Sequence, residues 1–224
     1  MPYRKVIFAN ERVYHILNRG VARTPIFLKT REYQRFLDLL DFYRHERPPL
    51  SFSHYFRLSS EEKSKFMKDL REKAKLVEIF AYCLMPNHFH LLIRQLQDNG
   101  ILKVLSNLQD GFVRFFNLRN ERKGPLFESV FKAIRIDTDE QLLHVSRYIH
   151  LNPSSSYLTT IQNLSAYPWS SFPEYLRERL PIIVNTEIVL GLAGGKKQYE
   201  KFVFDQAKYQ RDLEKIKHLA LENF

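Results

Sequence analysis

The feature that most constrains the fold is one apolar run between residues 80 and 95, FAYCLMPNHFHLLIRQ. Both halves have the composition of buried strands, and the Pro86-Asn87 pair between them is typical of a turn. The run therefore predicts a hairpin of two strands, residues 76–85 and 88–95. It also raises a question, because His88 and His90 are unusual residues for a buried hairpin.

The elements expected on either side of this hairpin follow from periodicity, turn residues and capping residues. We expect strands at 12–19 and 126–136, helices at 30–47 and 99–119, a short helix opened by a capping box at 59–62, and a helix from 139 to near Asn152, where Pro153 follows. The order β-α-β-β-α-β-α predicts an α+β fold, a ferredoxin-like split βαβ with an antiparallel sheet, followed by a further helix.

Two regions depart from this pattern. Residues 50–75 form a charged internal insertion, and after about residue 155 a linker-like stretch leads to an aromatic segment and a mostly polar helical tail over 186–218. We predict one domain over 1–155 and a tail over 156–224.

The charge balance points to a polyanionic partner. The 224 residues carry a net charge of +10 with 44% hydrophobic residues, and the isoelectric point is about 9.6. Nucleic acid fits this charge best, and an anionic membrane surface fits second. The single cysteine, Cys83, excludes an intramolecular disulfide and a four-cysteine zinc site. No run reaches the roughly 20 apolar residues of a membrane helix and no export leader is visible, so we expect a soluble, cytoplasmic protein.

The histidine pair lies at alternate positions of the second hairpin strand. His88 and His90 therefore point to one face of the sheet, where two imidazoles can bind one divalent metal ion. Taken alone, such a pair is more often two partly exposed histidines on a solvent face. A zinc site would need four good ligands, and Cys83 falls on the opposite face if the strand is unbroken. An oxygen ligand is the better complement.

The helix after residue 138 reads DEQLLHVSRYIHLNP and offers such an oxygen. Tyr148 lies off the centre of its apolar stripe, and Asn152 follows one turn later on the same face. From helix geometry alone, an amphipathic tyrosine beside an asparagine that helps to end the helix is the better explanation. The chemical alternative is that Tyr148 attacks a phosphodiester that is polarised by a metal held by His88, His90 and Asn152. Two imidazoles, an amide oxygen and waters suit Mg²⁺ or Mn²⁺.

Several segments together resemble a known family. The segments are VYHILNRG (13–20), MPNHFHLLI (85–93), FFNLRNERKGPLFES (115–129), FKAIRIDTDEQLLHVSRYIHLNP (131–153) and YPWSS (167–171). They resemble the REP-associated tyrosine transposases, which belong to the single-tyrosine branch of the HUH endonuclease superfamily. The resemblance extends over about residues 1–175.

The resemblance implies an enzyme that cuts single-stranded DNA near a hairpin and then transfers the strand. It places the nucleophile on Tyr148, which becomes joined to the 5′ phosphate and leaves a free 3′ hydroxyl. It places the metal ligands on His88, His90 and Asn152, where related insertion-sequence enzymes have glutamine in place of the asparagine. It further implies that the DNA partner carries a hairpin resembling a repetitive extragenic palindrome, and that the tail binds this hairpin. It favours a monomer over a dimer.

Exposed cations are the candidates for DNA contacts. They fall in two groups, Arg19 with Arg23, and Arg114, Arg119, Arg122, Lys123, Lys132 with Arg135. A solvated helix end favoured by the helix dipole explains the second group as well. The aromatic pair Phe115 and Phe116 fits core packing better than base stacking.

Two rival functions stay open at this point. One is a non-catalytic module that binds single-stranded nucleic acid on the same topology, although neither hairpin strand matches the RNP1 signature of RNA-recognition sheets. The other is a zinc-stabilised structural protein, which requires Cys83 near the histidines.

Overall fold

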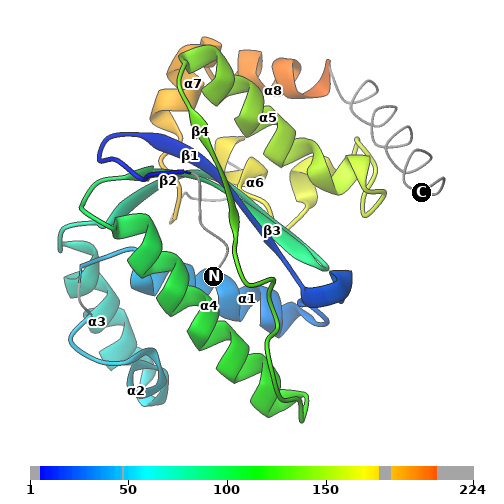
Figure 1. Ribbon diagram of the computed structural model, residues 1–224. Helices are drawn as coiled ribbons and strands as arrows, with labels where there is room; N and C mark the ends of the chain where they lie inside the picture. The colour runs from blue at the N-terminus through cyan, green and yellow to red at the C-terminus, as the bar shows by residue number, and fades with distance from the viewer. Residues whose placement is uncertain (1–5, 47, 177–182, 206–224) are drawn as a thin grey trace. The chain divides into compact units, whose positions relative to one another are not determined.

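A computed structural model describes residues 6–46, 48–176 and 183–205 of the chain (Figure 1). Its sheet has four strands in the order β2-β3-β1-β4. The strands are β1 (Val13–Arg19), β2 (Val77–Met85), β3 (His88–Gln95) and β4 (Lys132–Ile136). This order, with a β2–β3 hairpin at the predicted turn, is that of the split βαβ pattern, and the predicted α+β class with an antiparallel sheet is confirmed. Among the described residues no helix is both long and apolar enough to cross a membrane.

The helices are α1 (Thr30–Tyr43), α2 (Phe52–Arg57), α3 (Ser60–Arg71), α4 (Gly100–Arg119), α5 (Asp139–Ser155), α6 (Phe172–Tyr175), α7 (Glu187–Ala193) and α8 (Lys196–Phe204). Two short 3-10 turns, η1 (Val21–Arg23) and η2 (Leu164–Ala166), complete the elements. The capping box at Ser59 is confirmed, because its hydroxyl accepts from the Glu62 amide and the Glu62 carboxylate accepts from the Ser59 amide.

Three predicted boundaries were wrong. The strand expected over 126–136 is confined to β4, because bends at Ser129 and Val130 interrupt the ladder. The helix expected over 30–47 ends at Tyr43. Helix α5 continues through Pro153 to Ser155, since a proline near the last turn of a helix sacrifices a single backbone hydrogen bond.

The chain forms two compact units. The first comprises residues 1–78, 86–88 and 93–135. Within it α1 packs on α4, and the rings of Phe27, Phe36 and Phe112 meet at centroid distances of 5.3–5.5 Å.

The insertion at 50–75 is folded onto α1 in this unit. Its helices are attached by aromatic contacts, in which the Phe42 ring meets those of Phe52 and Phe66 at 5.2 and 5.8 Å. An ion pair adds to them, with Arg71 donating to the Asp41 carboxylate at 2.6 Å. The helix α2 within this insertion was not predicted, and Ser51 caps it by accepting from the His54 amide.

The second unit comprises residues 79–85, 89–92 and 136–224. In it the aromatic segment after residue 166 runs beside β2, where the Trp169 carbonyl accepts from the Leu84 amide at 2.8 Å and the Tyr82 carbonyl accepts from the Ser171 amide at 3.0 Å. Helices α7 and α8 pack against α5, and Gly194 and Gly195 separate them at positive φ, which glycine adopts readily. Part of the predicted tail therefore packs on the tyrosine helix, while the segment LEKIKHLALE lies outside the described residues.

Candidate active site

Strand β3 carries the histidine pair at its first and third positions. The alternation of a strand places His88 and His90 on one face. The His90 side chain is buried with 3% of its surface exposed, whereas His88 is partly buried.

The orientation of the His88 ring is defined by its neighbour Asn87. The Asn87 amide nitrogen donates to the carbonyl oxygen of Arg23 at 3.2 Å, and this fixes which end of the amide is oxygen. That oxygen lies 2.7 Å from Nδ1 of His88. Because an amide oxygen only accepts, Nδ1 carries the proton and Nε2 carries the lone pair. A metal-ligating histidine needs this arrangement, in which one ring nitrogen donates to a fixed acceptor and the other binds the metal.

His88 is also held in its neutral form. Burial, and to a smaller extent the nearby Arg19 guanidinium, lower its pKa from the ordinary 6.5 to about 4. At neutral pH the ring is therefore uncharged, which is the form that binds a metal.

The tyrosine helix α5 starts where its capping residues place it. The Thr138 hydroxyl accepts from the Gln141 amide at 3.1 Å, and the Gln141 side chain accepts from the Asp137 amide at 2.8 Å. On this helix Tyr148 is half-buried, and its ring packs against His90 with the centroids 5.7 Å apart and the planes at 88°. The structure thus brings a tyrosine and a histidine of the predicted set into contact within the second unit.

The third predicted ligand, Asn152, lies one turn after Tyr148. Its side chain is 5% exposed, and its amide nitrogen donates to the Tyr148 carbonyl at 2.9 Å. With the nitrogen committed to the helix backbone, the amide oxygen is the atom available as a ligand. Imidazole nitrogens and an amide oxygen are donors that a divalent metal such as Mn²⁺ or Mg²⁺ accepts.

Helix α5 is held in place by a buried hydrogen-bond chain. The Tyr199 hydroxyl of α8 lies 2.9 Å from the Ser146 hydroxyl and 2.8 Å from Nδ1 of His150. On the other side of the same ring, Nε2 of His150 lies 2.8 Å from the Ser171 hydroxyl. All four side chains are fully buried, and burial lowers the pKa of His150 to about 3. These hydrogen bonds link helix α5 to α8 on one side of the His150 ring and, on the other side, to Ser171, which directly precedes α6.

The predicted cations all lie in the first unit, and the structure divides them by their surroundings. Arg23, Arg114, Arg119, Lys123, Lys132 and Arg135 are exposed. Arg19 pairs with Glu128 at 3.4 Å. The Arg122 guanidinium donates to the Pro125 carbonyl at 2.7 Å and to the Asn117 side chain at 3.1 Å, so it stabilises the turn after α4.

Sequence reasoning missed Asn87, His150, Ser171 and Tyr199. A signal was present for Asn87, which stands directly before the first histidine in a turn where asparagine is common. The other three come from distant parts of the chain, and nothing in their local sequence predicts that they meet.

Zinc ligation by Cys83 finds no support. Cys83 is fully buried on β2 and its thiol contacts the Met85 sulfur at 3.6 Å, and burial raises the thiol pKa. Over residues 6–46, 48–176 and 183–205 no group of three or more His, Cys, Asp or Glu side chains could hold a metal ion. That finding does not test the predicted set, which includes an asparagine.

Residues 55–152 match the family model of the IS200-like transposases. A search of curated proteins found no match. Among solved structures, a REP-associated tyrosine transposase bound to a REP hairpin is similar with a TM-score of 0.54 at 16% identity, over 84% of this chain and 93% of that one. A protein of Deinococcus radiodurans R1 described as a candidate transposase aligns with a TM-score of 0.35 at 13% identity, over 66% of this chain and 95% of that one.

The family match covers the hairpin, the histidine pair and the tyrosine helix, and it supports a DNA-processing function of the transposase type. The likeness to the REP-associated transposase shows the same fold. The segment from residue 55 to residue 152 is therefore similar to the IS200-like transposases, in line with the resemblance of its motifs.

Proposed function

We propose that the protein is a metal-dependent single-stranded DNA endonuclease and strand transferase, with Tyr148 as its nucleophile. The observation that carries the proposal is the contact between Tyr148 and His90, which lies on the strand of the histidine pair. A tyrosine beside an imidazole that holds a metal ion would be suited to attack on a phosphodiester.

In the proposed reaction the Tyr148 oxygen forms a bond to phosphorus as the bond from phosphorus to the 3′ oxygen breaks. The phenolic proton is lost and the leaving 3′ oxygen takes up a proton, so one phosphodiester replaces another. A bound Mg²⁺ or Mn²⁺ would polarise the phosphodiester and offset its charge. His88, His90 and Asn152 would hold the ion, while the rigid strand and the packed helix keep Tyr148 oriented.

The proposed substrate is single-stranded DNA that carries a hairpin. The net charge of +10 favours a polyanion, and the similar REP-associated transposase is bound to a REP hairpin. The exposed cations from Arg114 to Arg135 would contact the phosphates. We propose that the protein acts as a monomer.

The test is formation of a protein–DNA adduct that survives denaturant. Labelled single-stranded DNA with a hairpin is incubated with the full chain and Mn²⁺, and the products are separated in denaturing gels. An adduct is expected with the unaltered protein and with Tyr157→Phe, a control at a tyrosine that is 61% exposed. No adduct is expected with Tyr148→Phe or after chelation of the metal.

An adduct that persists in Tyr148→Phe would refute the role of this tyrosine. Binding of several hairpin substrates without cleavage would refute the enzyme and favour a non-catalytic single-strand binding protein.

A further inference from the structure

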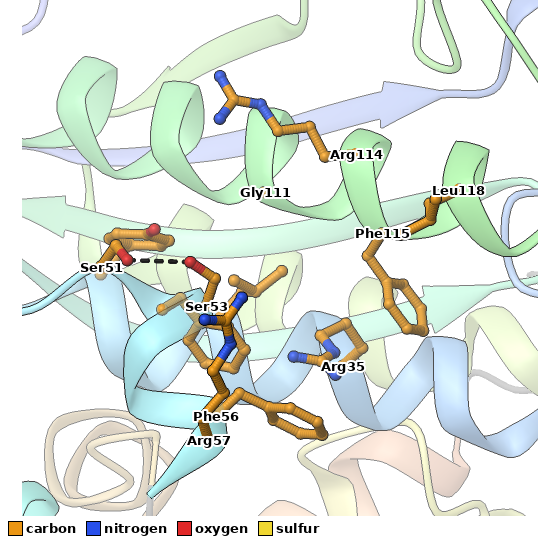
Figure 2. Close-up of a pocket in the computed structure, with 12 residues that line it drawn as sticks. Arg35, Ser51, Ser53, Phe56, Arg57, Gly111, Arg114, Phe115 and Leu118 are labelled. Atoms are coloured by element: carbon orange, nitrogen blue, oxygen red, sulfur yellow. Dashed lines mark hydrogen bonds between the residues drawn. The ribbon is translucent and has the colours of Figure 1, made fainter.

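A cavity of about 390 Å³ lies in the first unit, between α1, α4 and the inserted helix α2 (Figure 2). Its volume is in the range of ligand-binding pockets, which are about 300–1,000 Å³. No residue of the predicted metal site lines it. The insertion therefore contributes to a pocket to which no role has yet been assigned.

The lining of the cavity combines cations with aromatic rings. Three arginines line it (Arg35, Arg57 and Arg114), together with four aromatic residues (Tyr43, Phe52, Phe56 and Phe115). None of its lining residues is an aspartate or a glutamate. An environment of this kind attracts a ligand that is both anionic and aromatic.

Arg35 is held in the wall of the cavity by rings on several sides. Its guanidinium carbon lies 3.9 Å from the ring centre of Phe56, 4.6 Å from that of Phe115 and 5.0 Å from that of Phe52. Burial lowers the pKa of Arg35 and the nearby Asp38 raises it, and an arginine stays protonated at neutral pH under such shifts. The charge is therefore fixed in position before any ligand arrives.

The inserted helix α2 adds a second cation and an exposed ring. Arg57 is exposed, and the Phe56 side chain is 51% exposed although it is large and apolar. Figure 2 shows Arg57 and Arg35 on the same side of α4, while the Arg114 guanidinium is turned away from them. Lys63, from the next helix, lies 5.0 Å from the Phe56 ring centre and adds another positive charge.

We infer that this cavity binds a nucleotide of single-stranded DNA, with Arg57 contacting a phosphate and the Phe56 and Arg35 surface stacking on a base. Single-strand binding sites combine cations along the backbone with flat side chains on which bases stack. A duplex cannot use such a pocket, since its bases are already stacked in pairs. The inference rests on the proposed function. It adds to that function a second DNA-binding surface, which the insertion helps to build.

The experiment measures binding of a fluorescein-labelled 12-nucleotide oligothymidylate to the full chain. All variants carry Tyr148→Phe and the buffer contains a chelator, so that no adduct forms. Anisotropy titrations at several salt concentrations give the affinity and its dependence on salt for Arg57→Gln and Phe56→Ala. Lys65→Gln is the matched control, because it removes an equal charge from an exposed position of α3 outside the cavity.

Phe56→Ala is expected to weaken binding by about 5-fold or more without changing the salt dependence, because it removes an uncharged stacking surface. Arg57→Gln is expected to lower the slope of log affinity against log salt by about 0.7, the value for one phosphate of a single strand. Lys65→Gln should change neither quantity to this extent. Circular dichroism of each variant checks that the fold is retained.

The inference is overturned if both cavity variants bind like Lys65→Gln, or if the parent protein does not bind the oligonucleotide. Its failure is distinct from failure of the proposed function, which is read from the Tyr148 adduct on hairpin DNA. An adduct with unaltered binding in the cavity variants rejects the cavity alone. Weakened binding in these variants without any adduct rejects the enzyme and keeps the cavity as a single-strand site.

Discussion

The Tyr199 hydroxyl offers the sharpest test of how the tyrosine helix is held. It is fully buried and lies within 2.9 Å of both the Ser146 hydroxyl and Nδ1 of His150. Tyr199→Phe keeps the ring and its packing but removes the one group that bridges these two polar atoms. The Ser146 hydroxyl keeps its hydrogen bond to the Leu143 carbonyl, so the change costs it one bond of about 1 kcal/mol, whereas Nδ1 of His150 is left without this partner at a cost of about 1–3 kcal/mol. The free energy of unfolding of the variant should therefore be about 2–4 kcal/mol lower than that of the parent protein.

Tyr175→Phe is the matched comparison within the same unit. The Tyr175 hydroxyl is also fully buried, but it donates to a single acceptor, the Phe80 carbonyl, at 2.7 Å. Removal of this hydroxyl affects one polar atom, the Phe80 carbonyl oxygen, so the free energy of unfolding is expected to decrease by about 1–2 kcal/mol. The exposed Tyr157, changed in the same way, should alter stability by less than about 0.5 kcal/mol.

Urea unfolding followed by far-ultraviolet circular dichroism measures the three variants on one scale. The expected order of destabilisation is Tyr199→Phe, then Tyr175→Phe, then Tyr157→Phe. If Tyr199→Phe were no more destabilised than Tyr157→Phe, the hydrogen-bond chain would not hold helix α5 and the reasoning would be refuted.

Three further predictions follow from other parts of the chain. Asn87→Ala should weaken Mn²⁺ binding by about 10- to 100-fold in calorimetric titrations, because it removes the acceptor that orients His88; unchanged affinity would exclude this role. Gly20→Ala should lower the melting temperature, because a Cβ there would lie 2.2 Å from a backbone oxygen, whereas Gly191→Ala, with nothing within 4 Å, should not lower it. Burial lowers the pKa of His45 from 6.5 to about 4, so on acidification the unfolded chain takes up a proton at this residue at a higher pH than the folded chain does. The free energy of unfolding therefore decreases as the pH falls below 6.5. Between pH 7.5 and 5 this residue alone accounts for about 2 kcal/mol of that loss, and urea unfolding of His45→Gln at both pH values should show a shallower decline than the parent protein.

The local sequence determined the elements that carry the predicted site. Two apolar strands around Pro86-Asn87 specify a hairpin, because such segments gain free energy only when buried and paired. Strand alternation then places His88 and His90 on one face, and helical periodicity places Asn152 one turn after Tyr148. These relations depend on residues close together in the chain, so they could be predicted without the tertiary structure.

Boundaries were less predictable, because they depend on competing local effects. Pro153 is a signal for the end of a helix, yet α5 continues to Ser155 within a packed environment. The short helix α2 has few residues from which a period could be recognised, and its aromatic side chains are ordered by contacts with α1.

Only the tertiary structure decided which distant residues meet. The contact of His90 with Tyr148 joins residues 58 positions apart, and the chain from Ser171 through His150 to Tyr199 joins three separate segments. The cavity likewise forms where α1, α2 and α4 come together. A sequence specifies such contacts through the packing of the whole core, which no single motif records.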